Sequence, residues 1–99
     1  MICASVAIQV LPNCMNKKET VRIVDQVINY IKSTGVSYFV GPFETTMEGD
    51  YDQLMEIVKN CQLIAVEEGC PSVMSYVKIN YQKEGGVLTI EEKTKPYHL

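Results

Sequence analysis

The segment 41–50, GPFETTMEGD, concentrates side chains that can bind a small polar molecule. The hydroxyls of Thr45 and Thr46 can both donate and accept hydrogen bonds, and the carboxylate of Glu48 can hold a cation or an amino-heterocycle. Gly49 lets the backbone approach a ligand closely. Together these groups suit a small, polar, aromatic ligand.

A second interpretation of the same segment needs no ligand. Threonine is a good strand former, and the carboxylates of Glu48 and Asp50 are favourable beside the positive N-terminus of a following helix. Side chains alternate along a strand, so Thr45 and Thr46 are directed to opposite faces and at most one of them faces a given pocket. The residues alone leave both interpretations open.

Other residues with catalytic or metal-binding chemistry are not grouped along the chain. Its cysteines form no CxxC motif and its single histidine is close to the C-terminus: Cys3, Cys14, Cys61, Cys70 and His98. Zinc sites, redox pairs and Cys-His or Ser-His catalysis need such groups as recognisable partners. We therefore predict reduced thiols packed as small apolar side chains, with no metal, no cofactor and no catalytic residue.

Length and composition predict one globular domain. The chain has 99 residues, of which 46% are hydrophobic and 21% charged, with a net charge of −3. It contains no apolar run of roughly 20 residues, as a membrane span requires, and its N-terminus lacks the basic region of a secretory signal. Lys and Arg are scattered. We expect a cytoplasmic protein with neither membrane nor nucleic acid as a partner.

Periodicity predicts two helices and four strands. A strand is expected over residues 3–11, where apolar and small or polar side chains alternate. A helix over residues 17–34 follows the capping pair Asn16 and Glu19, and a second over residues 51–68 follows Asp50 and Gln53. The stripe expected to pack on the sheet comprises Val21, Val24, Val27, Ile28 and Ile31 in the first helix and Leu54, Ile57, Val58, Cys61, Ile64 and Ala65 in the second.

The remaining strands are expected over residues 36–40, 43–48 and 72–81, the first two separated by a bend at Gly41 and Pro42. The tail after Gly86 has a capping-box spacing at Thr89 and Glu92. A strand stub, a helical turn and an arm that reaches a neighbour all remain possible for it.

The order β α β β α β predicts a ferredoxin-like α+β sandwich, in which two helices cover one face of a four-stranded antiparallel sheet. The other face would then present a mixed set of side chains: Cys3, Ser5, Ala7, Gln9, Met74 and Tyr76. Such a surface favours association with another copy of the chain and a pocket at the contact. A merely solvated face is the alternative.

Three motifs carry a resemblance to a known family. These are SVAIQVLP, GPFETTMEGD before a helix, and KINYQKEGGVLTIEEK. Together they resemble the small, single-domain members of the YkoF-like thiamine-binding proteins over essentially the whole chain.

The resemblance implies non-catalytic binding of thiamine or its hydroxymethylpyrimidine moiety, by a carrier, buffer or sensor. It further implies a homo-oligomer, a dimer or a tetramer, whose subunits meet through their sheets with the ligand nearby. On this basis Glu48 would meet the aminopyrimidine or offset the thiazolium charge. Gln9 and either Thr45 or Thr46 would supply neutral hydrogen bonds, and the aromatic rings of Tyr38, Phe39 and Tyr76 are candidates for stacking.

Two other classes of function are compatible with the sequence. One is an oligomeric regulatory or interaction module without a thiamine-type ligand. The other is an enzyme in which Glu48 acts as a base, since a ferredoxin-like fold by itself does not determine activity.

Overall fold

The computed structural model describes residues 1–14 and 16–98 of the chain. Its elements follow the predicted order, with a short helix and a 3₁₀ turn added near the C-terminus. Their bounds are β1 Ala4–Pro12, α1 Lys17–Ser33, β2 Ser37–Val40, β3 Thr45–Gly49, α2 Tyr51–Glu67, β4 Val73–Tyr81, α3 Ile90–Thr94 and the 3₁₀ turn Lys95–Tyr97. Each predicted strand and helix is present, with ends within two residues of those expected.

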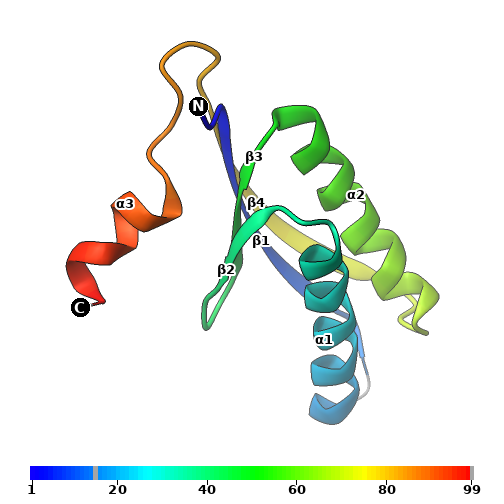
Figure 1. Ribbon diagram of the computed structural model, residues 1–99. Helices are drawn as coiled ribbons and strands as arrows, with labels where there is room; N and C mark the ends of the chain where they lie inside the picture. The colour runs from blue at the N-terminus through cyan, green and yellow to red at the C-terminus, as the bar shows by residue number, and fades with distance from the viewer. Residues whose placement is uncertain (15, 99) are drawn as a thin grey trace.

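The four strands form one antiparallel sheet in the order β2-β3-β1-β4. Helices α1 and α2 pack against each other and cover one face of the sheet (Figure 1). This arrangement is the ferredoxin-like α+β sandwich, so the predicted fold is confirmed. Among the helices of the described residues, none has both the length and the apolar character needed to cross a membrane.

Both long helices begin at the side chains that the sequence marks as caps. The Asn16 side chain accepts a hydrogen bond from the Glu19 backbone N–H at 2.9 Å. The Asp50 carboxylate accepts one from the Gln53 N–H at 3.0 Å. These bonds satisfy donors that have no partner inside a helix, which explains why the predicted starts are confirmed.

The buried stripe of α1 differs from the predicted one at its first position. Val21 is 58% exposed, whereas Ile23 is 1% exposed and packs in the core with Val27 and Ile31. Residues two apart on a helix are separated by roughly 200° around its axis, so burying Ile23 turns Val21 toward solvent. In α2 the core includes the predicted Cys61, which is fully buried.

Strand pairing determines which side chains face away from α1 and α2. Ala4, Val6 and Ile8 of β1 lie in the core beneath the helices, so their neighbours in β1 point to the opposite side. We call that side the open face. By register it carries Ser5, Ala7, Gln9 and Leu11 of β1, Phe39 of β2, Thr46 and Glu48 of β3, and Met74, Tyr76, Lys78 and Asn80 of β4.

The C-terminal segment 86–98, which we call the tail, returns over the open face. Its path starts beside the N-terminus, where the Val87 N–H donates to the Ile2 carbonyl at 2.7 Å. Gly86 makes this approach possible: its φ is +73°, and a Cβ there would lie 2.7 Å from the Ile2 carbonyl oxygen. Helix α3 therefore lies on the side of the sheet opposite to α1 and α2 (Figure 1).

The tail divides the open face into two parts. Beneath it lies the covered part, Ser5, Thr46 and Glu48, in which Ser5 is 6% and Glu48 7% exposed. The bare part comprises Gln9, Leu11, Met74 and Tyr76, and Met74 and Tyr76 are 60% and 58% exposed. The expectation of an uncovered face was thus correct for one part only, because the tail folds as a helix over the other.

Candidate functional site

Two adjoining hollows lie on the open face between the sheet and α3, and both are lined by Thr46 and Lys93. One, of about 270 Å³, is lined by Ser5, Ala7, Glu44, Thr46, Lys78, Ile79, Asn80 and Lys93. The other, of about 200 Å³, is lined by Phe39, Thr46, Ile90, Lys93 and Thr94. We call the pair the tail hollow.

Three charged side chains line the tail hollow. Lys93 reaches from α3 to the sheet, where its Nζ donates to Ser5 Oγ at 3.1 Å. The Lys78 ammonium pairs with the Glu44 carboxylate at 3.1 Å, and the Lys78 side chain is 74% exposed. An ion pair this exposed contributes little to stability, so either partner can turn to a ligand at small cost.

Glu48 anchors the tail to the sheet. Its buried carboxylate accepts a hydrogen bond from the backbone N–H of Ile90, which is the first residue of α3. Next to it the predicted capping box is present: the Glu92 N–H donates to Thr89 Oγ1 at 3.1 Å and the Thr89 N–H donates to Glu92 Oε1 at 2.9 Å. A five-residue helix has little stability of its own, so these contacts hold it in place.

Of the three aromatic rings proposed for stacking, Phe39 lines the tail hollow. Its ring centroid lies 6.1 Å from that of His98, at an interplanar angle of 43°. Tyr38 packs against the core on the helix side, and Tyr76 belongs to the bare part of the open face. Phe39 is therefore the ring that a flat ligand in the hollow would meet.

The predicted site residues occupy three different places. Thr46 lines both halves of the tail hollow, and Glu48 lies beside the hollow with its carboxylate bound to the tail. Gln9 is on the bare part of the open face. Thr45 is opposite Ile8 on the helix side and is 7% exposed. The two threonines do point to opposite faces, as strand alternation predicts.

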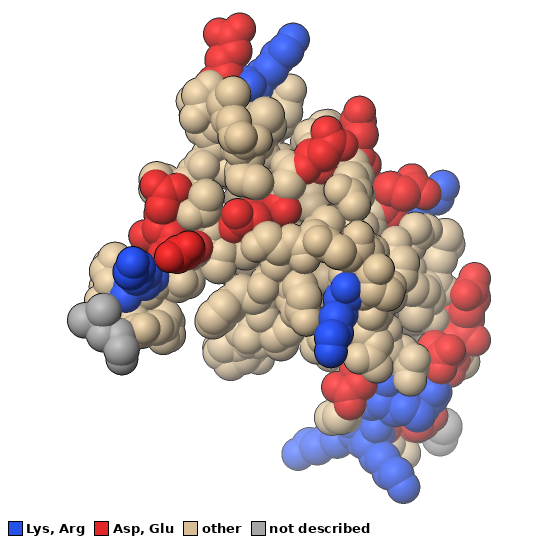
Figure 2. Space-filling model, viewed as in Figure 1, with Lys and Arg blue, Asp and Glu red and all other residues tan. Residues whose placement is uncertain are grey.

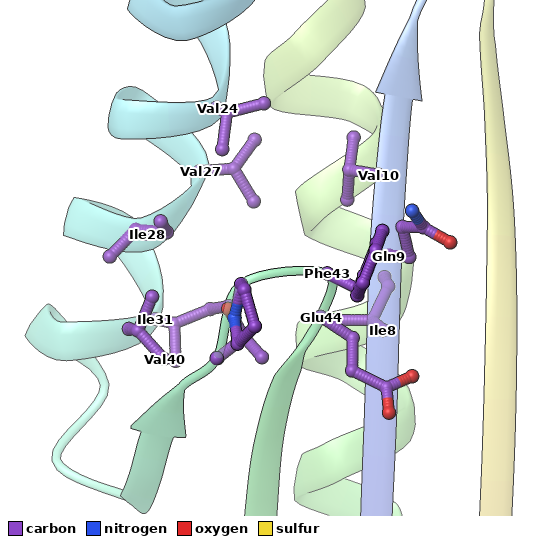
Figure 3. Close-up of a pocket in the computed structure, with 13 residues that line it drawn as sticks. Ile8, Gln9, Val10, Val24, Val27, Ile28, Ile31, Val40, Phe43 and Glu44 are labelled. Carbon is purple, nitrogen blue, oxygen red and sulfur yellow. The ribbon is translucent and has the colours of Figure 1, made fainter.

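A further cavity, of about 100 Å³, lies between α1, the end of β1 and the loop that joins β2 to β3. Figure 3 shows Val24 and Val27 of α1 pointing toward Val10 of β1, while the amide of Gln9 points away toward β4. Apolar side chains make up most of its wall. The predicted residues Gln9 and Thr45 also contribute to its wall, together with Glu44. Its volume is nevertheless less than that of either half of the tail hollow, so it offers a small polar ligand less room.

The sequence does not mark Ser5, Glu44, Lys78 and Lys93 as members of the site, although strand alternation assigns Ser5 to the open face. Lys78 and Lys93 are brought to it by strand pairing and by the return of the tail, neither of which leaves a local signal. For Phe39 the sequence does contain a signal of its place on the open face. Once Tyr38 is assigned to the core, alternation directs Phe39 to the open face.

Known proteins match this chain over nearly its whole length. The sequence model of the family described as "Thiamine-binding protein" matches residues 6–98. A UPF0045 protein from Clostridium perfringens is 50% identical over 97 residues, which cover 98% of this chain and 99% of that protein.

Solved structures agree with this match. A DUF77 domain of unknown function from Bacillus cereus is 36% identical, with a TM-score of 0.86 over 95% of this chain and 88% of that one. A Thermotoga maritima protein, described provisionally as a thiamine biosynthesis/salvage protein, is 33% identical, with a TM-score of 0.83 over 95% of this chain and 97% of that one. The chain belongs to the thiamine-binding protein family.

Proposed function

We propose that the protein binds thiamine or its hydroxymethylpyrimidine moiety in the tail hollow without transforming it. The observation that carries this proposal is the convergence of Thr46, Lys93 and Phe39 on one hollow of the open face, in a chain of the thiamine-binding family. The Thermotoga relative with a provisional thiamine biosynthesis/salvage role supports the same class of ligand.

The groups around the hollow match the chemistry of an aminopyrimidine. Its ring nitrogens accept hydrogen bonds, which the Thr46 hydroxyl and the Lys93 ammonium can donate. Its exocyclic amine donates, and the Glu44 carboxylate can accept. Phe39 offers a face for the flat ring. For intact thiamine, the carboxylates of Glu44 and Glu48 would offset the thiazolium charge.

We further propose a homo-oligomer, a dimer or a tetramer, formed through the open face. Support comes from the bare part, where Leu11, Met74 and Tyr76 expose apolar surface beside the hollow. Each half of the hollow is smaller than the roughly 300 Å³ at which small-molecule pockets usually begin, and both open outward. A second subunit on this face would enclose the ligand, and Gln9 would then lie at the subunit contact.

The role that follows is a cytoplasmic carrier, buffer or sensor. Binding without turnover is supported by the use of Glu48, the one carboxylate considered as a base, to hold the tail. If the protein were an enzyme acting through Glu48, incubation with thiamine would yield a new product by mass spectrometry. We expect the ligand to be recovered unchanged.

Thermal unfolding with thiamine, hydroxymethylpyrimidine or thiazole tests the ligand directly. A ligand that binds only the folded protein stabilises it by about 2.7 kcal/mol at one hundred times its Kd. We expect a rise in Tm with thiamine or the pyrimidine. No rise with any of the three at millimolar concentration would contradict the proposal, and a stable oligomer in that result would favour a regulatory or interaction module.

The two adjacent threonines provide a matched pair of variants. Thr46→Val removes the hydroxyl in the hollow and should weaken binding about tenfold, as measured by calorimetry. Thr45→Val makes the same chemical change on the helix side of β3, so it should leave the affinity unchanged. Equal affinities for the two variants would indicate that the ligand binds outside the tail hollow.

A further inference from the structure

Cys14 and Cys70 lie side by side although 56 positions separate them in the chain, and their Sγ atoms are 3.9 Å apart. Cys14 is in the loop between β1 and α1, and Cys70 is in the loop between α2 and β4. The sheet brings these loops together, because β1 and β4 pair as far as Pro12 and Val73 and the Asn13 N–H donates to the Ser72 carbonyl at 3.0 Å.

The other two cysteines are in different surroundings. Cys61 is fully buried in the core, where burial raises the pKa of its thiol to about 12. Cys3 precedes β1 at the opposite end of that strand, and its Sγ lies 3.6 Å from the Lys83 carbonyl oxygen. Cys14 and Cys70 are therefore the cysteines that the fold places as a pair.

We propose that Cys14 and Cys70 form a redox-modification site, which closes to a reversible disulfide by exchange with a small dialkyl disulfide of the oxidised glutathione type. A disulfide needs an S–S distance of about 2.05 Å, so the two sulfur atoms must approach by less than 2 Å from their van der Waals contact. Both residues are in loops, where rotation of the side chains can provide this shift. The inference is independent of the proposed ligand.

The reaction is two successive thiol-disulfide exchanges. The Cys14 thiolate attacks one sulfur of the small disulfide, which forms a mixed disulfide and releases one small thiolate that takes up a proton. The Cys70 thiol then loses its proton to solvent and attacks the Cys14 sulfur, which releases the second small thiol. The protein dithiol is oxidised, and the small disulfide is reduced to two thiols. Excess small thiol reverses both steps.

Exposure assigns the order of attack. Cys70 is 2% exposed, and its Sγ donates to the Ser72 carbonyl at 2.7 Å. Cys14 is half-buried and lines two surface hollows, one beside Lys17 and the other beside Glu19 and Pro71. Cys14 is thus the sulfur that a small molecule reaches first, and Cys70 is the resolving thiol.

The surroundings of Cys14 determine at which pH its thiol reacts. In Figure 2, Lys and Arg gather with acidic side chains at the lower right, where Figure 1 places the start of α1. Burial, then the Cys70 thiol, and more weakly the Glu19 carboxylate raise the pKa of Cys14 above its ordinary value, while the nearby Thr20 hydroxyl opposes the shift. The thiolate is scarce at neutral pH, so oxidation should be slow at pH 7 and faster at pH 9.

The experiment incubates the intact protein with oxidised glutathione and measures its mass without reduction. Wild-type protein should lose two hydrogen masses, without a retained glutathione, and regain them with excess reduced glutathione. Cys70→Ser should instead keep one glutathione on Cys14. Cys14→Ser should form no internal disulfide. Cys3→Ser, the matched control, should behave as wild type.

Two results would overturn the inference: a wild-type protein that only accumulates glutathione adducts, or a Cys14→Ser variant that still loses two hydrogen masses. A second readout, which does not use Cys70→Ser, tests the proposal if that variant folds poorly. Oxidation of wild-type protein should raise its Tm by on the order of 10 °C, because the crosslink closes a long loop. The Tm of Cys14→Ser should not change on oxidation, and an equal rise in that variant would also contradict the site.

Discussion

The covered and bare parts of the open face belong to the same face of the same sheet, yet they differ in exposure to solvent. Ser5 and Glu48 in the covered part are almost inaccessible, whereas Met74 and Tyr76 in the bare part are more than half exposed. The difference comes from the tail, which folds back over one part only. The tail hollow occurs where that cover is incomplete, and apolar side chains stay exposed where it is absent.

The anchor of the tail should give the largest effect. Glu48→Ala removes the carboxylate that accepts the Ile90 N–H. Hydrogen bonds to charged groups contribute about 1.5–3 kcal/mol, so the tail amides should exchange with solvent about 30-fold faster, as measured by hydrogen exchange. Glu91→Ala is the control, because the Glu91 side chain is 79% exposed. If the tail amides exchange at the same rate in both variants, Glu48 does not hold the tail on the sheet.

The capping box should give an intermediate effect. Thr89→Ala removes the hydroxyl that accepts the Glu92 N–H, which is expected to cost about 1 kcal/mol. Hydrogen exchange should then quicken about fivefold in the tail and remain unchanged in the strands. Thr89→Ser keeps the acceptor and should resemble the wild type. An equal acceleration of exchange in the tail and in the strands would instead show that the tail and the sheet unfold as one unit.

The bare part should give the smallest effect on the stability of a single chain. Met74→Lys should change the free energy of unfolding by no more than about 0.5 kcal/mol, since the side chain is 60% exposed. The proposed oligomer of this variant should nevertheless dissociate at a higher protein concentration than that of the wild type, as measured by analytical ultracentrifugation. Leu63→Lys, on α2 and 48% exposed, is the control. Equal assembly of the two variants would exclude the bare part as the contact.

Local patterns predicted most of the fold, because its determinants are local. Alternation in β1, the caps at Asn16 and Asp50, and the apolar spacing of α2 each act within a few residues, and each is confirmed. The stripe of α1 was misjudged at Val21 because several β-branched residues share that helix. Which of them faces the sheet depends on packing.

The site was less predictable because its contacts are distant in sequence. The Thr89 and Glu92 spacing indicated a helix start, but contacts distant in sequence determine where that helix lies: Glu48 binds Ile90, 42 positions away, and Ser5 binds Lys93. Alternation separated Thr45 from Thr46, yet the pairing of Thr46 with Ala7 of β1 decides which of them faces the tail. The nearness of Cys14 to Cys70 likewise depends on the end of the β1–β4 pairing.

Gly86 controls whether the tail can reach the open face at all. The backbone passes so close to Ile2 and Met1 that any side chain at this position would collide with them. A single methyl group added at residue 86 would therefore push the start of the tail away from Ile2 without contacting the hollow itself. The absence of a side chain at Gly86 thus allows the tail to cover the proposed ligand site.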